Sequence, residues 1–260
     1  MGIVTGGVVT GILSARIFAG VLADLGGWRL VYLTLSGLTL GMALVLARVL
    51  PPRAPAGPGG LSYPALLRSM VLLFREERVL RLRAAFAFLI FATFNVLWAP
   101  LVLPLSGPPW SLPHSVTGLF GLAGLAGALS AGRAGQLADR GLARRTTGVA
   151  LVLMLLAWGP IAVLGWFSGA WVLAALVLGI LLLDLAIQAV HVTNQSLIFP
   201  LRPEARSRLV GGYMVFYSLG SAAGALSATM AYAAAGWPGV CLLGAGLSAA
   251  ALVLWAVAWE

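Results

Sequence analysis

The chain has 260 residues, of which 61% are hydrophobic and only 9% are charged, and its mean hydropathy is +1.02. In soluble domains roughly a quarter of all residues are charged, so this composition excludes a soluble globular domain. The net charge of +9 does not indicate nucleic-acid binding, because the arginines stand in short breaks between apolar runs. A single cysteine excludes an intrachain disulfide and a cysteine metal cluster.

Apolar runs that can cross a bilayer organise the whole chain. Each crossing of roughly 30 Å of hydrocarbon needs about 20 residues. Eight runs satisfy this length: 3–22, 29–50, 84–105, 115–137, 146–166, 170–195, 209–233 and 238–259. Turn residues separate them, as in Gly107-Pro108-Pro109. We therefore predict an all-α fold, a polytopic transmembrane helical bundle.

The arginines lie on alternate breaks between these runs. The breaks at 48–83, 133–145 and 202–208 hold 14 of the 16 basic residues, whereas those at 107–113 and 234–239 hold none. Positively charged loops stay on the cytoplasmic side of a membrane. We therefore predict a multi-pass protein of the cell (inner) membrane with both termini in the cytoplasm.

The segment 51–83 is the one long linker. It begins with a proline- and glycine-rich stretch and continues from Leu61 to Arg83 as a predicted amphipathic helix. The apolar side of that helix comprises Leu66, Met70, Leu73 and Phe74. Such a helix lies on the inner membrane surface. The linker divides the chain into two spans at 1–50 and six at 84–260.

The stretch from Gly135 to Arg145, which reads GQLADRGLARR, resembles the signature cytoplasmic loop of the major facilitator superfamily, G-x-L-A-D-R-x-G-R-R. It falls between the second and third spans after the linker, where the family has its second copy. The resemblance implies a gating motif formed by Gly135, Asp139, Arg140, Arg144 and Arg145. A carboxylate and a guanidinium at a helix end can bind each other or a neighbouring helix terminus and so latch one conformation. Simple anchoring by positive charge is the alternative.

A second stretch, with Gly20 eight residues before Trp28-Arg29, is similar to the fifth and sixth helices of drug:proton antiporters. Arg16 stands where that branch has a proline. On the twelve-helix template of the family, the eight spans correspond to helices five to twelve, and an N-terminal four-helix segment would be missing. The resemblance implies a secondary transporter that exports small molecules by alternating access, with protons as the coupling ion.

Polar residues within the predicted spans are candidates for a substrate or proton pathway, since an ionisable group at mid-bilayer costs at least ~2.5 kcal/mol. Most of them lie in the sixth span, where Asp184, Gln188, His191 and Gln195 fall on one helical stripe and Asn194 lies beside it. On the template this span lines the central cavity, where a carboxylate and an imidazole can bind a polar substrate or carry a proton. An interhelical hydrogen-bond seam that only packs the bundle is the alternative.

Three further residues join this set. Asn95 and Trp98 lie in another cavity-lining helix of the template, although an amide that only packs the bundle is an equal alternative for Asn95. Arg16 stands among apolar neighbours and needs a partner or water, unless its side chain reaches outward towards Asp24.

Several functions lack their machinery in this sequence. It contains no phosphate-binding loop, nucleophile elbow or zinc-binding helix motif, so we expect no cofactor, no metal and no catalytic residue. An intramembrane enzyme built on Asp184 and His191 would lack a positioned nucleophile. The expected partners are the lipid bilayer, a small-molecule substrate and protons, with no nucleic acid. A non-transporting truncated fragment or a partner-dependent membrane subunit is the alternative function.

Overall fold

Helices and the turns that join them make up the described structure. The computed structural model describes residues 2–50, 62–123 and 133–258 and, within these ranges, all side chains except those of 2–14, 16, 123, 138 and 139. Five helices in this part of the chain are long and apolar enough to cross a membrane. The predicted all-α polytopic transmembrane bundle is therefore confirmed.

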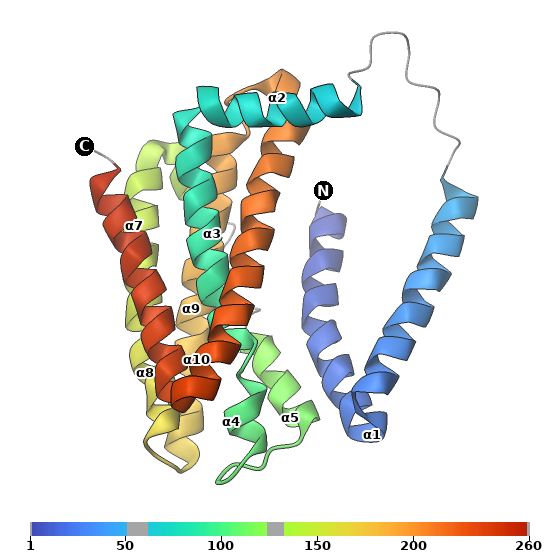
Figure 1. Ribbon diagram of the computed structural model, residues 1–260, viewed down its shortest axis with the longest axis vertical. Coiled ribbons are helices and arrows are strands. Elements are labelled where there is room, and N and C mark those ends of the chain that lie inside the picture. Colours follow the sequence, from blue (N-terminus) through green and yellow to red (C-terminus); the bar gives the residue numbers. More distant parts are fainter. Residues whose placement is uncertain (1, 51–61, 124–132, 259–260) are drawn as a thin grey trace.

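Two of these helices fold back on themselves, and each supplies two of the predicted spans. α1 (Gly2–Val49) turns at Gly26 and Gly27, and α10 (Arg206–Val257) turns at Gly236 (Figure 1). The φ angles of Gly27 and Gly236 are 69° and 62°, a left-handed conformation that residues with a Cβ rarely adopt. The glycine-containing breaks in the sequence thus become the turns between the two arms of each hairpin.

The remaining spans are built from helices of different lengths. They comprise α3 (Arg78–Trp98), α4 (Val102–Ser106), α5 (His114–Leu119), α7 (Ala143–Leu156), α8 (Trp158–Ala162) and α9 (Ala170–Ile198). The predicted span 84–105 is interrupted after Trp98, because Pro100 has no N–H to continue the helical bonding. Of the predicted span 115–137, residues 124–132 lie outside the described part of the chain.

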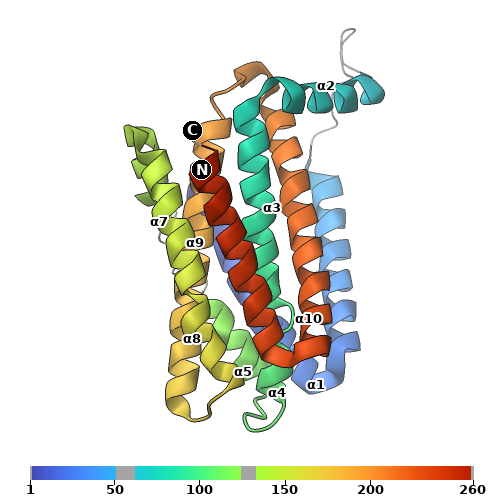
Figure 2. The ribbon, with the colours of Figure 1, turned by 60° about the vertical axis from the view of Figure 1, so that its left-hand side comes forward.

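The linker helix α2 (Tyr63–Glu76) lies across one end of the bundle, roughly perpendicular to the spans (Figure 2). We predicted that this helix would continue to Arg83, but the backbone is extended at Glu77 and α3 begins at Arg78. The arginines of this stretch suggest a membrane surface, whereas the face of α3 that begins at Leu80 packs into the bundle. The amphipathic helix is therefore shorter than predicted.

Arg202 ties the turn before α10 to the end of α2. Its Nε donates to Glu77 Oε1 at 2.8 Å, and its Nη2 donates to Glu76 Oε2 at 3.1 Å. The hydrogen bond to Glu77 raises the pKa of the Arg202 guanidinium. Phe74 of α2 packs against Phe216 of α10, with ring centroids 5.2 Å apart. Two of the arginine-rich breaks, 48–83 and 202–208, thus meet at one end of the bundle.

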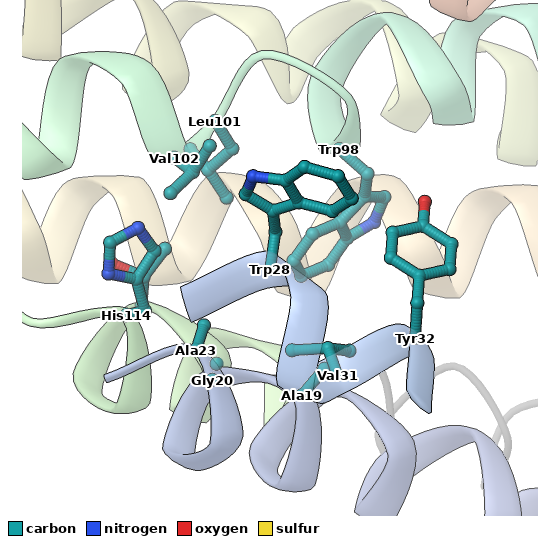
Figure 3. A pocket seen from close by; sticks show the side chains of 12 residues that line it. Ala19, Gly20, Ala23, Trp28, Val31, Tyr32, Trp98, Leu101, Val102 and His114 are labelled. Carbon is teal, nitrogen blue, oxygen red and sulfur yellow. The ribbon is translucent and has the colours of Figure 1, made fainter. Parts of the chain in front are cut away.

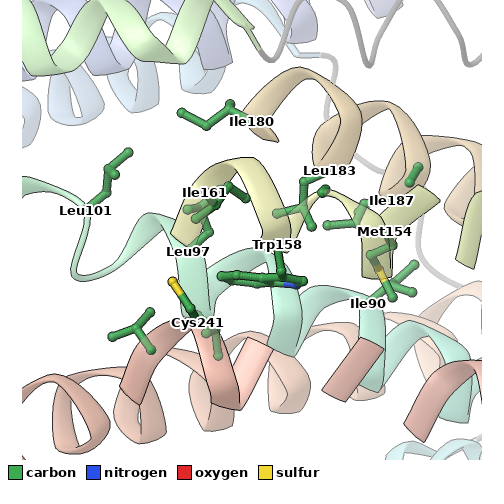
Figure 4. Packing of buried hydrophobic residues seen from close by; sticks show 14 of the residues in the cluster. Ile90, Leu97, Leu101, Met154, Trp158, Ile161, Ile180, Leu183, Ile187 and Cys241 are labelled. Carbon is green, nitrogen blue, oxygen red and sulfur yellow. The ribbon is translucent and has the colours of Figure 1, made fainter. Parts of the chain in front are cut away.

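Trp158 of α8 lies at the centre of the apolar core between α3, α8, α9 and α10 (Figure 4). Its ring fills the space left by Gly244, where a Cβ would overlap the indole. Its Nε1 donates to Ser248 Oγ at 3.1 Å, so the polar edge of the indole is satisfied inside the core. A glycine and a serine one turn apart on α10 therefore fix the position of this indole.

Gly220 and Gly224 bring α10 into backbone contact with α3. A Cβ on Gly220 would overlap the backbone of Phe88, and a Cβ on Gly224 would overlap the backbone of Ala92. Ala228, which continues the row, is fully buried. The small residues at four-residue spacing therefore serve close helix packing.

Candidate functional site

The polar stripe of α9 enters a hydrogen-bonded cluster near the end of the bundle that α2 covers. His191 Nδ1 lies 2.8 Å from the Tyr213 hydroxyl, and Gln195 Nε2 lies 3.2 Å from His191 Nε2. Asn194 Nδ2 donates to the Tyr213 hydroxyl at 3.4 Å. Two of the four stripe residues, His191 and Gln195, are thus brought together with the neighbouring Asn194, and Tyr213 of α10 joins them.

Arg83 is a buried charged residue of this cluster that the sequence analysis did not single out. Its side chain is only 1% exposed, and its Nη1 donates to Asn194 Oδ1 at 3.2 Å and to Thr147 Oγ1 at 3.3 Å. Arg83 therefore links α3, α7 and α9. The signal was helical spacing, since Leu80, Arg83, Ala84 and Ala87 fall on one face and all four are buried.

Asp184 belongs to a different contact, two helical turns away from His191. Its side chain is 4% exposed, and Trp98 Nε1 donates to its Oδ1 at 3.3 Å. The structure thus joins two of the predicted pathway residues that stand on different helices. Asn95 is not brought into this contact, because its Nδ2 donates to Phe91 O of its own helix at 3.0 Å.

A pocket of about 320 Å³ lies between the turn end of α1 and the bundle (Figure 3). Residues of α1 form one side, and Trp98, Leu101 and Val102 form the other. The α1 side consists of Ala19, Gly20, Ala23, Trp28, Val31 and Tyr32, and His114, Thr117 and Gly118 complete the lining. The lining is mostly apolar and aromatic, with a few polar groups, as is typical of a small-molecule site. Because the indole of Trp98 lines the pocket and bonds to Asp184, it connects the pocket with the buried carboxylate.

Asp24 holds α1 against the bundle beside this pocket. Its Oδ1 accepts from the backbone N–H of His114 at 2.9 Å and lies 3.0 Å from His114 Nδ1, and its Oδ2 accepts from the Ser115 N–H at 2.8 Å. Asp24 thus caps the start of α5. Close approach of Gly20 to the His114 backbone leaves no room for a Cβ there.

Arg16, for which Asp24 was considered as a neighbour, lies within α1 one turn before Gly20. Its side chain lies outside the described part of the structure. Its role on the pathway therefore stays a prediction.

The predicted gating motif spans the turn before α7 and the helical residues on either side of it. Residues Ala138–Leu142 make a π-type turn, and Gly141 within it has a φ of 77°. Gly141 thus supplies the left-handed residue that reverses the chain here. Gly135 lies in the preceding helical segment, where an added Cβ would lie 3.5 Å from Val192 of α9. Asp139 stands in the turn, but its side chain is not among those described.

The three arginines of the motif are exposed. The carbonyl of Arg144 accepts a hydrogen bond from Trp255 Nε1 at 3.1 Å, and the guanidinium lies 5.8 Å from the Trp255 ring centroid. These contacts fasten the start of α7 to the end of α10. Arg140 lies in the turn and Arg145 in the first turn of α7, where it also borders a groove between α7 and α9.

Membrane-length helices, a polar cluster inside the bundle and an apolar pocket beside a hairpin together define a polytopic membrane protein. The sequence profile of the Major Facilitator Superfamily matches residues 1–199. The uncharacterized transporter YgaY of Escherichia coli O157:H7 is 46% identical over 255 residues, which cover 98% of this chain and 63% of that protein. The chain therefore belongs to the Major Facilitator Superfamily.

Other relatives are also transport proteins by name. Transporter SCO4007 of Streptomyces coelicolor is 32% identical over 244 residues, which cover 92% of this chain and 54% of that protein. The inner membrane transport protein YnfM of Escherichia coli K12 is 28% identical over 140 residues, or 54% of this chain and 33% of that protein. The chain thus spans less than two thirds of the length of the curated relatives it matches. No solved structure matches the chain.

Proposed function

We propose that the chain acts in proton-coupled efflux of small molecules by alternating access, in the manner of the drug:proton antiporter branch. The observation that carries this proposal is the pocket of about 320 Å³ between α1 and the bundle. The indole of Trp98 forms part of its wall and bonds to the buried carboxylate of Asp184. A substrate in the pocket and a proton on Asp184 would therefore act on the same side chain.

The position of α1 supports a rocking movement of two bodies. The main contacts of α1 with the bundle are made to α5 and to residues 120–123, next to the capping bonds of Asp24. At the opposite end α2 crosses the bundle, and Arg202 holds it there. Breaking the contacts at Asp24 would free the turn end of α1 from the bundle and open the pocket. Rigid-body rocking about a central site is how transporters with internal repeats alternate their access.

The proton pathway that we propose runs through the α9 stripe. Asp184 is the buried carboxylate, Gln188 stands one turn further, and His191 continues the row towards Tyr213 and Arg83. Exchangeable protons on the imidazole, the phenol and the amides can relay charge along this side of the helix. The arginine-rich end would face the cytoplasm, together with both termini.

Proteoliposomes with an imposed pH gradient test this proposal. Ethidium serves as the first probe, because a planar aromatic cation matches a pocket lined by Trp28, Tyr32 and Trp98. Ethidium movement that follows the pH gradient, and that Asp184→Asn abolishes, would support proton-coupled transport. Movement that is indifferent to the gradient would reject the coupling.

A partner-dependent subunit is the second candidate, and the second arm of α1 favours it. Large apolar side chains along this arm are exposed in the structure, among them Leu33, Leu38, Leu40 and Leu44. Lipid can cover them, but so can four further helices of the family template. Activity that appears only on co-expression with the first four helices of the Escherichia coli relative would favour the subunit. Flux by the chain alone would exclude it.

A further inference from the structure

A groove of about 320 Å³ opens between residues 133–137, α7 and α9, on the arginine-rich side of the bundle. The pocket beside α1 and the polar cluster do not share its lining. Two guanidinium groups, those of Arg133 and Arg145, border it, and both side chains are exposed. The rest of its lining is aliphatic except for Thr146, whose hydroxyl donates to Leu142 O at 3.0 Å.

The groove runs from the arginines into the membrane-spanning part of α7. Arg145, Val149 and Leu153 follow at four-residue spacing and all line it, so they lie on one face of the helix. At 1.5 Å per residue, Leu153 lies about 12 Å deeper than Arg145. This depth is close to one leaflet of hydrocarbon, which is about half of 30 Å.

The two ends of the groove differ as the two ends of a phospholipid do, since one end is bordered by arginines and the deep end is apolar. The deep part is apolar, with Leu185 and Ala189 of α9 contributing to it. Val149 is 61% exposed, so the aliphatic wall is accessible from the side of the helix. No acidic side chain lines the groove among the residues whose side chains are described. Asp139 lies in the turn between the two arginines, and its side chain is outside that set.

We propose that this groove binds one anionic phospholipid from the leaflet on the arginine-rich side. The guanidinium groups of Arg133 and Arg145 would hold its phosphate, since arginine forms paired hydrogen bonds with phosphate oxygens. An acyl chain would lie along Val149 and Leu153. Basic pockets between transmembrane helices on this side are suited to anionic head groups. The lipid would thereby rest against the turn that carries the family's gating motif.

Native mass spectrometry of the purified full chain in neutral detergent tests the proposal. The probes are dioleoyl phosphatidylglycerol and dioleoyl phosphatidylcholine, which share their acyl chains and differ in net charge. We expect phosphatidylglycerol to bind preferentially and the double variant R133Q/R145Q to weaken it about 25-fold, since each arginine near the surface is worth roughly a factor of five. The matched control R206Q/R208Q removes the same charge from the same end outside the groove, and it should retain binding.

The variant V149W tests the apolar part without a change in charge. Val149 is exposed, so an indole can occupy the groove without entering the core, and we expect it to weaken phosphatidylglycerol binding. Equal binding of the two lipids would overturn the proposal. So would equal losses in R133Q/R145Q and R206Q/R208Q, because these would indicate general surface attraction. Displacement by glycerol phosphate as effective as by the whole lipid would also overturn it, since the acyl chain would then contribute nothing.

Discussion

The indole N–H of Trp98 donates to the carboxylate of Asp184 across 3.3 Å, from α3 to α9. Trp98 also lines the pocket beside α1. A single side chain therefore contacts both the space for a ligand and a buried ionisable group. This relationship gives the proposed coupling of substrate and proton a physical link.

Asp184→Asn should abolish transport driven by a pH gradient while the protein is still inserted and folded. The amide keeps an oxygen that can accept the Trp98 N–H, so packing is preserved, but it cannot take up a proton. Flux in proteoliposomes at several imposed gradients measures the effect. Asp184→Glu is the control and should retain part of the gradient dependence. Unchanged pH dependence in Asp184→Asn would remove Asp184 from the proton pathway.

Arg83→Lys should lower the melting temperature of the detergent-solubilised chain by roughly 3–10 °C. Lysine cannot reproduce the two hydrogen bonds of the guanidinium to Asn194 and Thr147, and hydrogen bonds of a charged group contribute about 1.5–3 kcal/mol. Arg78→Lys is the matched control, because Arg78 is exposed on the same helix and should change stability little. Thermal unfolding followed by circular dichroism distinguishes the two. Equal melting temperatures would show that the buried network contributes little to stability.

Gly220→Ala should destabilise the chain by about 1–3 kcal/mol, the usual cost of overpacking. The added methyl group would overlap the backbone of Phe88, which cannot move aside as a flexible side chain can. Gly246→Ala offers a control within α10, since nothing lies within 4 Å of its added Cβ. That variant should be neutral or slightly stabilising, because alanine favours helix. Comparison of the two unfolding midpoints in detergent tests the backbone contact between α3 and α10.

Asp24→Ala should loosen the start of α5 and its contact with α1. The carboxylate accepts hydrogen bonds from the N–H groups of His114 and Ser115, and the loss of a helix cap costs about 1 kcal/mol. We expect faster hydrogen exchange at residues 114–117, with unchanged exchange in α9. Asp24→Asn retains one acceptor oxygen, so its exchange at residues 114–117 should be slower than in Asp24→Ala and faster than in the unmodified chain. Exchange that is equal in all three proteins would contradict the capping role.

Most of the secondary structure follows from the sequence because lipid imposes a simple requirement on each span. About 20 apolar residues are needed whatever the neighbours are, so hydropathy and turn residues identify the helices. The roles of the turn glycines and of the close-packing glycines, Gly220 and Gly224, also follow from the sequence, since each acts through the absence of its own Cβ. The stretch from Gly135 to Arg145 also indicates the family without knowledge of the fold, because it is a contiguous motif in the sequence.

Contacts between helices cannot be predicted from the sequence in this way. Helical spacing places Asp184 and His191 on one stripe and Asn194 beside it, but it does not say which neighbours they meet. In the tertiary structure, hydrogen bonds pair Asp184 with Trp98, His191 with Tyr213 and Asn194 with Arg83. It also turns Asn95 back onto its own helix. Which of two polar groups becomes a partner depends on interhelical distance and rotation, and neither is contained in the spacing along one helix.

Arg83 and Asp24 show most clearly what could not be predicted from the sequence. Composition alone assigns Arg83 to a charged linker and Asp24 to an outer turn, because hydropathy averages each residue with its neighbours in the sequence. The fold buries Arg83 among α3, α7 and α9 and puts Asp24 on the start of α5. The sequence by itself determined the helices, the turns and the family. Only the packing of the helices decided which polar side chains are buried and paired, because burial is set by residues far away in the chain.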